Sequence, residues 1–205
     1  MAMPPRVLDH LVVAADTLEQ GVAWCEATLG VRPSVGGQHV FMGTHNRVFD
    51  ISTAHYPRAY LEIIAIDPSL PAPGRARWFD LDDAAMQQRL AAAPQLVHWV
   101  ARVDDIAAAR TAMLADGIDS GRVIDAERGA LRWRITVRDD GQRPQGGAAP
   151  ALIQWLGPHP TDALPASDVR LASASAAPDR FSVELETPRG RVALMIDAAV
   201  LSTSS

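Results

Sequence analysis

One short segment of this sequence occurs twice, and this repeat constrains the fold more than any other feature. Residues 8–16 read LDHLVVAAD, and residues 96–104 read LVHWVARVD. In each copy a histidine lies two residues into an apolar run, and an acidic residue follows six positions later. A helix-like segment comes after each run. The repeat therefore predicts two similar modules whose histidines, His10 and His98, can converge on one shared site.

The composition is that of a soluble globular protein. The chain has 205 residues, of which 48% are hydrophobic and 21% charged, so it can bury a sizeable core. A net charge of −5 gives no reason to expect a nucleic-acid partner. Cys25 is the only cysteine, which excludes an internal disulfide and a thiolate metal cluster. Because no apolar run approaches the ~20 residues of a membrane span or forms a secretory signal, we expect a cytoplasmic protein with no membrane partner.

The first copy of the repeat opens a β-α-β-β-β unit. Residues 7–15 are short, apolar and β-branched, as in a buried strand. Thr17 and Gln20 have the spacing of a capping box, and Gly30 is placed to end the helix that follows. The pair Gly36 and Gly37 predicts a loop. Three more strands are predicted over residues 39–42, 46–51 and 60–66.

The second copy repeats the same order after a proline-rich connector. The connector, residues 68–94, is predicted to contain a helix over residues 79–93. In the second unit Asp104 is placed to cap a helix that ends near Asp116. The strands of this unit are predicted over residues 97–103, 122–127, 131–137 and 151–156. A final set of strands is predicted over residues 169–175, 181–186 and 191–196, before a tail at residues 201–205.

These elements predict an α+β fold. Paired βαβββ modules, residues 1–67 and 95–160, form a cupped mixed sheet around a small-molecule cavity. Residues 68–94 connect the modules, and residues 161–205 form a C-terminal β extension and tail.

Strand alternation selects the side chains that can face the cavity. Side chains of a strand point alternately to opposite faces, and the face that carries Trp99 is expected to pack against helices. His98 then points to the other side of the sheet. Glu62 lies in the middle of an apolar strand, and Gln154 occupies the corresponding position of the second module. A carboxylate there is costly to bury unless it is paired, hydrogen-bonded or bound to a cation.

This combination resembles a known superfamily. Repeated βαβββ units with a histidine on strand one and Glu or Gln on strand four are similar to the vicinal oxygen chelate superfamily, which includes glyoxalase I, bleomycin-resistance proteins and extradiol dioxygenases. Within it the chain resembles the glyoxalase-like domain branch. The motifs that carry this resemblance are LDHLV (8–12), GGQH (36–39), GTHN (43–46), YLE (60–62) and LRWR (131–134).

The resemblance implies a metal-dependent enzyme of lyase, isomerase or dioxygenase type that acts on a small oxygenated substrate. Its metal positions correspond to His10, Glu62, His98 and Gln154, which suit Zn, Ni, Mn or Fe. Glu62 is also the expected catalytic proton shuttle. The alternative is a metal-free small-molecule binding or resistance protein on the same scaffold. Members often form homodimers, and an exposed edge near residues 151–156 or the C-terminal strands can supply the interface.

Two further groups are candidates for substrate binding. His39, Thr44 and Asn46 offer donors and acceptors beside glycines that let a ligand approach the backbone; the alternative is two tight turns without a ligand. Arg132 and Arg134 share one face of an alternating strand. They form either an anion-binding wall or a solvated sheet face.

Overall fold

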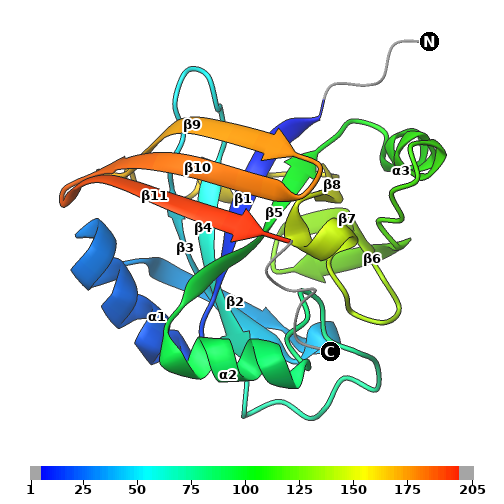
Figure 1. The fold of residues 1–205 in the computed structure, drawn as a ribbon, viewed down its shortest axis with the longest axis horizontal. Helices are drawn as coiled ribbons and strands as arrows, with labels where there is room; N and C mark the ends of the chain where they lie inside the picture. Colours follow the sequence, from blue (N-terminus) through cyan, green and yellow to red (C-terminus); the bar gives the residue numbers. More distant parts are fainter. Residues whose placement is uncertain (1–5, 199–205) are drawn as a thin grey trace.

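The two predicted modules meet in one curved sheet (Figure 1). The computed structural model describes residues 6–198, so the predicted tail at 201–205 lies outside the described residues. Within the described part, eight strands follow the order β2-β3-β4-β1-β5-β8-β7-β6. The outer strands of each module pair antiparallel, β1 pairs parallel with β4, and β5 pairs parallel with β8. The modules join through the antiparallel β1–β5 pair, which confirms the α+β class and the paired modules.

The first module follows the predicted order. Its elements are β1 (Val7–Ala14), α1 (Leu18–Trp24), a π-helical turn (Cys25–Leu29), β2 (Ser34–His39), a 3₁₀ turn (Val40–Met42), β3 (Thr44–Asp50) and β4 (Tyr60–Ile66). The Thr17 hydroxyl accepts a hydrogen bond from the Gln20 backbone N–H, as predicted, and the Gln20 side chain accepts one from the Asp16 N–H. Gly30 ends the helix in the left-handed conformation, with φ 76°.

The predicted loop at Gly36 and Gly37 is wrong, because both residues lie inside β2. A Cβ atom on Gly36 would lie 2.1 Å from the Asn46 Oδ1 atom. The Gly37 N–H donates to the same oxygen at 2.8 Å. Glycine is therefore required here for the close approach of a strand to Asn46. The strand predicted over residues 39–42 is also wrong. His39 is the last residue of β2, and Val40–Met42 form the 3₁₀ turn.

The connector and the second module differ from the prediction at two helix starts. Their elements are α2 (Ala84–Ala92), β5 (Gln95–Arg102), α3 (Ile106–Ala115), β6 (Arg122–Arg128), β7 (Leu131–Val137), a 3₁₀ turn (Pro144–Gly147) and β8 (Ala151–Trp155). The connector helix begins late because Phe79 and Asp80 have φ values of 62° and 59°, and Asp83 caps it. Asp105, not Asp104, caps α3 through hydrogen bonds to two backbone N–H groups.

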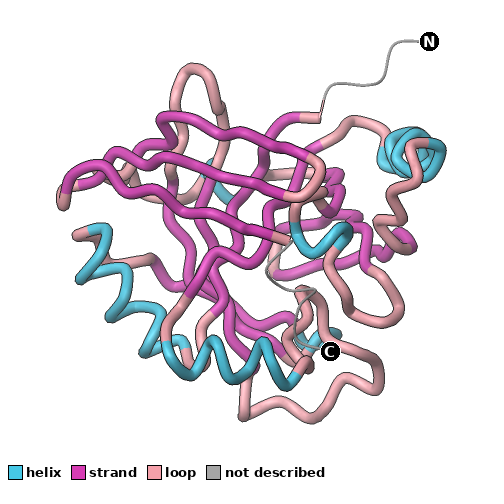
Figure 2. Tube along the Cα trace, viewed as in Figure 1, coloured by secondary structure: helices cyan, strands magenta, loops and turns pink. Residues whose placement is uncertain are grey.

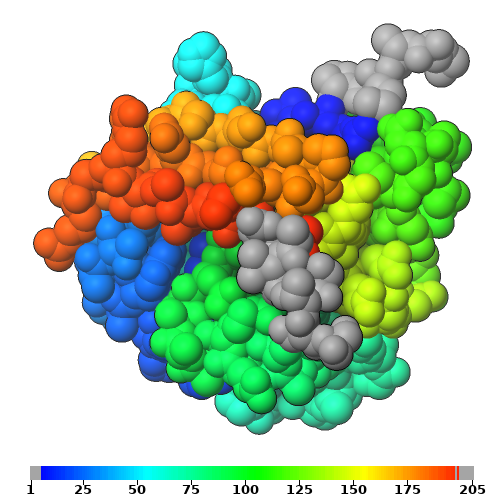
Figure 3. Space-filling view, viewed as in Figure 1, coloured from blue at the N-terminus to red at the C-terminus, as the bar shows by residue number. Residues whose placement is uncertain are grey.

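A separate C-terminal sheet covers the middle of the convex face (Figures 1 and 3). After a 3₁₀ turn (Pro160–Asp162), its strands are β9 (Arg170–Ala177), β10 (Arg180–Thr187) and β11 (Gly190–Asp197), in the order β11-β10-β9. The Trp99 ring stacks on Phe181 with centroids 4.5 Å apart. The C-terminal sheet therefore shares the face of Trp99 with the expected helices, because Leu18 of α1 and Ile106 of α3 belong to the buried clusters that Trp99 packs against. The helices lie around the sheets (Figure 2).

Two remaining features bear on partners. Strand β8 lies between β5 and β7, so residues 151–156 are not the exposed edge that was predicted as a dimer interface. The edges of the C-terminal sheet are β9 and β11. Across residues 6–198, no helix combines the length and the apolar character needed to span a membrane.

The packing of the C-terminal sheet gives a stability prediction. Replacing Phe181 by Ala removes a side chain that is 1% exposed, so we expect the free energy of unfolding to fall by about 3–5 kcal/mol. Met195→Ala on the same sheet is the control, because this side chain is 54% exposed and its loss should cost about 0.5 kcal/mol or less. Urea denaturation measures both. Equal effects would mean that the extension is not part of the core.

Candidate functional site

A small cavity lies inside the cup, where polar side chains of both modules meet aromatic rings. Its volume is about 30 Å³, which is enough for ordered water. The polar side chains that line it are His10, His39, Asn46, Glu62 and Arg128. The aromatic side chains that line it are Tyr60, Trp78, Phe79, Trp133 and Trp155.

Glu62 and His10 form the centre of this cavity. They come from the paired strands β4 and β1 and are 5% and 4% exposed. The Glu62 Oε1 atom accepts a hydrogen bond of 2.5 Å from the Asn46 amide, whereas Oε2 faces the His10 Nε2 atom at 3.8 Å. This distance is too long for a direct hydrogen bond. An atom of a bound molecule that lies beside the line joining them, about 3 Å from each, can therefore contact both groups.

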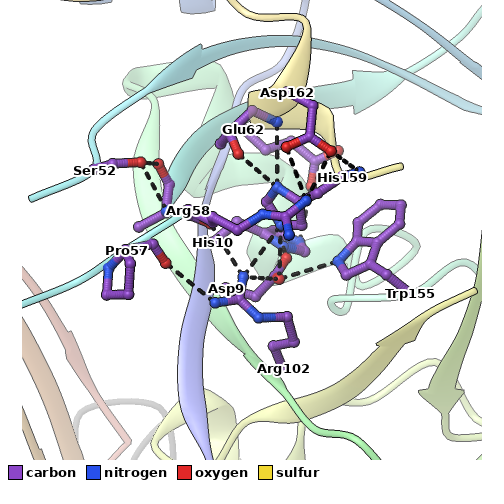
Figure 4. A network of polar contacts seen from close by, with 12 residues as sticks. Asp9, His10, Ser52, Pro57, Arg58, Glu62, Arg102, Trp155, His159 and Asp162 are labelled. Atoms are coloured by element: carbon purple, nitrogen blue, oxygen red, sulfur yellow. Dashed lines mark hydrogen bonds and ion pairs between the residues drawn. The ribbon is translucent and has the colours of Figure 1, made fainter. Parts of the chain in front are cut away.

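Asp9 holds the imidazole of His10 in place (Figure 4). Its Oδ1 atom accepts a hydrogen bond of 2.7 Å from His10 Nδ1. Its Oδ2 atom accepts hydrogen bonds from Arg102 Nη1 at 3.2 Å, Trp155 Nε1 at 3.1 Å and His159 Nε2 at 3.1 Å. Burial opposes the charge of Asp9, but the hydrogen bonds from His10 and His159 outweigh it and hold the pKa of Asp9 below its usual range.

The charge of Asp9 determines the tautomer of His10. An ionised carboxylate only accepts hydrogen bonds, so His10 Nδ1 must carry a proton. The Nε2 atom then faces Glu62 and the cavity. In a regular strand, Asp9 would point to the face opposite His10. A β-bulge between Leu8 and His10 places the extra residue, Asp9, beside the imidazole instead.

The predicted group of His39, Thr44 and Asn46 does assemble, and it contacts Glu62. His39 Nδ1 lies 3.2 Å from the Thr44 hydroxyl, and His39 Nε2 lies 4.0 Å from Glu62 Oε1. Arg128 reaches this group from β6. Its Nη1 atom donates to Asn46 Oδ1 and to His39 Nε2, both at 3.2 Å. One network therefore runs from Arg128 through Asn46 to Glu62.

Burial keeps two rings of this network uncharged. Burial, and next the positive charge of Arg128, lower the pKa of His39 to about 3. A neutral His39 agrees with its role as acceptor from Arg128. Burial and the nearby charges of Asp9 and Glu62 raise the pKa of Tyr60 well above its ordinary value. The Tyr60 ring stacks on His10 with centroids 4.5 Å apart, so it restrains the imidazole from the other side.

His98 lies inside the cup but is held by the protein itself. Its Nε2 atom accepts a hydrogen bond of 3.0 Å from the Ala151 backbone N–H. The proton of the neutral ring is then on Nδ1, which is buried without a partner among the described residues. Burial, and next the charge of Arg143, lower the pKa of His98 well below its ordinary value. Neither ring nitrogen offers a free lone pair to a cation.

The four residues predicted to bind a metal ion are not brought together. His10 and Glu62 meet, but the Gln154 amide donates to the Asp104 carbonyl at 2.5 Å, at the exposed side of the sheet. A divalent ion needs several convergent lone pairs, and His98 and Gln154 do not supply them. Within residues 6–198, no group of three or more His, Cys, Asp or Glu side chains is arranged for a metal ion. The arrangement therefore does not fit the expected ion.

The two arginines predicted to bind substrate lie outside the cavity. Trp133 and Ile135 face the cup from β7, so the alternate residues Arg132 and Arg134 face outward. Arg134 Nε pairs with Asp125 at 2.9 Å, and Arg132 Nε pairs with Glu127 at 3.4 Å. The pattern of the strand placed them correctly on one shared face, which is the solvated face.

Three contributors were missed because they lie at strand or turn ends. Arg128 is the last residue of β6, and His159 precedes a short 3₁₀ turn after β8. Arg102 is the last residue of β5. Alternation within a strand says nothing about a side chain that crosses to another strand. Arg102 lies inside the second copy of the repeat, residues 96–104, whereas no sequence pattern marks Arg128 or His159.

Comparisons with known proteins agree with this architecture. A family model described as "Glyoxalase-like domain" matches residues 8–186. A solved structure of a hypothetical protein from Staphylococcus aureus is similar in fold, with a TM-score of 0.57 and 12% identity over 94% of this chain and 86% of that chain. Methylmalonyl-CoA epimerase from Mycobacterium tuberculosis has a TM-score of 0.46 and 18% identity over 80% of this chain and 97% of that chain. No curated protein matches the sequence.

The buried histidines predict a loss of stability in acid. The ordinary pKa of histidine is about 6.5, whereas that of folded His39 is about 3. Between these values the unfolded chain binds more protons, so the free energy of unfolding falls as the pH decreases. Each such histidine contributes up to about 1.4 kcal/mol per pH unit. His98 acts in the same direction, and Asp9 adds to the loss at still lower pH.

Urea titrations between pH 7 and pH 4.5 measure this slope. The variant His39→Gln should have a shallower slope than the unmodified protein by up to about 1.4 kcal/mol per pH unit. His55→Gln removes an exposed histidine and should retain the full slope. An unchanged slope in His39→Gln would show that His39 does not titrate in this way.

Proposed function

The chain belongs to the glyoxalase-like domain family of the vicinal oxygen chelate superfamily, and from this premise we propose that it is an acid–base enzyme of isomerase or lyase type. It moves a proton on a small oxygenated substrate bound inside the cup. The observation that carries the proposal is the pair of Glu62 and His10, whose Oε2 and Nε2 atoms face each other at 3.8 Å. Each member has its own fixed partner and is buried at the cavity.

Glu62 has the properties of a general base. One oxygen is held by Asn46 at 2.5 Å, which fixes the carboxylate plane, while the other oxygen has no hydrogen bond to residues 6–198 and faces the cavity. A carboxylate with a free oxygen in a water-poor site is positioned to accept a proton from carbon. Its desolvation also strengthens every electrostatic interaction around it.

His10 is the complementary group. Asp9 accepts the Nδ1–H hydrogen bond of His10, and in this proposal His10 is doubly protonated, with Nε2–H directed to the cavity. Glu62 Oε2 removes a proton from the carbon next to a substrate carbonyl. The C–H electron pair becomes the C=C bond of an enolate, and the carbonyl oxygen gains the negative charge. His10 Nε2–H donates a hydrogen bond to that oxygen. For a 2-hydroxy carbonyl substrate, His10 protonates that oxygen and takes the proton of the neighbouring hydroxyl, and Glu62 delivers its proton to the former carbonyl carbon. For a substrate with a β-substituent, that group leaves with its bonding electron pair instead.

No step of this proposal passes through a metal ion. The predicted ligands His98 and Gln154 are engaged by the Ala151 N–H and the Asp104 carbonyl. Acid–base catalysis by two positioned groups requires only the residues that the cavity contains. A homodimer stays a prediction from the family resemblance.

A metal-free binding protein is the second candidate. The aromatic lining favours it, because Trp78, Phe79 and Trp133 present large apolar surfaces to a small cavity. Both functions use the same side chains. They differ in whether the negative charge of Glu62 is needed.

The variant Glu62→Gln separates the two functions. It keeps the size of the side chain and removes the base, so we expect proton exchange at carbon to fall by about 10²–10⁴-fold. The measurement is deuterium incorporation from D₂O into 2-oxobutanoate and into 2-hydroxy aldehydes, followed by proton NMR. Glu186→Gln, an exposed residue of β10, is the matched control and should retain the full rate.

Two results would contradict the enzyme proposal. One is exchange that is no faster with the unmodified protein than with Glu62→Gln for any of these probes. The other is exchange that a chelator abolishes and a divalent metal restores, because this would make the ion necessary. If Glu62→Gln keeps the thermal stability of the unmodified protein, a loss of exchange is due to the missing carboxylate and not to unfolding.

A further inference from the structure

The edges of the curved sheet come together beside the cavity, and Arg128 spans the gap between them. Strands β2 and β6 are the two edges of the sheet, and they lie next to each other. A Cβ atom on Gly37 would lie 2.7 Å from the Arg128 Cδ atom, so the arginine stem packs directly on β2. From there its Nη1 atom reaches Asn46 and His39 at 3.2 Å.

Outside this gap lies an open groove of about 970 Å³, which we call the edge groove. Residues that line it include Gly36, Gly37, Val40, Phe41, Trp133 and Leu156. Val40 and Leu156 are 63% and 50% exposed, which leaves apolar surface open to a ligand. Arg128 and Trp133 line both the edge groove and the inner cavity. The two spaces are therefore adjacent parts of one site.

The part of the chain that the structure describes places no acidic partner on Arg128. No carboxylate of the described residues lies within ion-pair distance of its guanidinium group. The acidic residues of the edge groove are already occupied, because Asp125 pairs with Arg134 and Glu127 pairs with Arg132. The Nε and Nη2 groups of Arg128 make no hydrogen bond to the described residues. This free edge of a guanidinium matches a carboxylate.

We propose that Arg128 binds the carboxylate of an amphiphilic substrate whose apolar chain lies in the edge groove. Asn46 and His39 each contact both Arg128 and Glu62, so a carboxylate on Arg128 directs the adjacent carbons of the substrate toward Glu62. The inner cavity, at about 30 Å³, receives the reacting group, and the larger groove receives the chain. This inference rests on the proposed function for the role of Glu62, but the binding it describes is independent of catalysis.

Isothermal titration calorimetry with butanoate, hexanoate, octanoate and octan-1-ol tests the proposal. We expect the affinity of the carboxylates to rise about threefold to fourfold per methylene, since each one leaves water. Octan-1-ol has the same chain without the charge and should bind at least about tenfold more weakly than octanoate. Equal affinity for butanoate and octanoate, or for octanoate and octan-1-ol, would overturn the proposal.

Variants assign the binding to the two parts of the site. Arg128→Gln should weaken octanoate binding about tenfold or more. Arg128→Lys keeps the charge but not the planar guanidinium group, so its affinity should lie between those of the unmodified protein and Arg128→Gln. Arg134→Gln on the outer face is the matched control and should bind as the unmodified protein does. Leu156→Ser should reduce the gain per methylene. Unweakened binding by both Arg128 variants would overturn the role of Arg128, and Arg128→Lys provides this answer even if Arg128→Gln does not fold.

The variant Glu62→Gln distinguishes this proposal from the proposed function. It should lose proton exchange and still bind octanoate in an Arg128-dependent manner. Lost exchange with binding that does not depend on Arg128 would leave the enzyme proposal standing and remove this one. If octanoate binding depends on Arg128 but neither the unmodified protein nor Glu62→Gln exchanges protons, this proposal stands and the enzyme proposal is removed.

Discussion

The structure depends on a buried negative charge at the seam between the two modules. Asp9 lies in the bulge of β1, and its four hydrogen-bond partners come from β1, β5, β8 and the turn after β8. A carboxylate without these donors would be very costly to bury. Because the donors come from both modules, the seam can form only when the second module is folded against the first. The same bonds fix the tautomer of His10, so the constraint that joins the modules also prepares the site.

The two modules share a topology but contribute unequally to the site. The first supplies His10, His39, Asn46 and Glu62, which form the polar network. In the second, His98 is bound to the main chain of β8, and the position equivalent to Glu62 is Gln154, which faces outward. Phe79 has a left-handed backbone conformation, and its ring packs 5.2 Å from the ring of His98 in this half of the cup. The asymmetry leaves the facing pair of His10 and Glu62 in place of four symmetric ligands.

The repeat and the strand alternation were sufficient to predict the fold class, the order of the modules and the inward position of Glu62. The group of His39, Thr44 and Asn46 was predicted from polar residues beside glycines, and these side chains lie together in the structure. The repeat and the alternation failed where a single residue departs from regular geometry. The bulge at Asp9, the left-handed Phe79 and Asp80, and the glycines inside β2 are each set by tertiary contacts. Side chains that cross from a strand end, such as Arg128, follow no periodic pattern and were missed for that reason.

Closure of the sheet explains why the glycine pair and Arg128 belong together. A curved sheet with two free edges exposes unpaired backbone groups at each edge. Here the edges meet, and a long side chain from β6 crosses onto β2 because Gly37 has no side chain to obstruct it. Gly36 lets Asn46 approach from the neighbouring strand, which places the amide between Arg128 and Glu62. A larger residue at either glycine would separate Arg128 from Glu62. The same two glycines therefore allow the sheet edges to meet and the network from Arg128 through Asn46 to Glu62 to form.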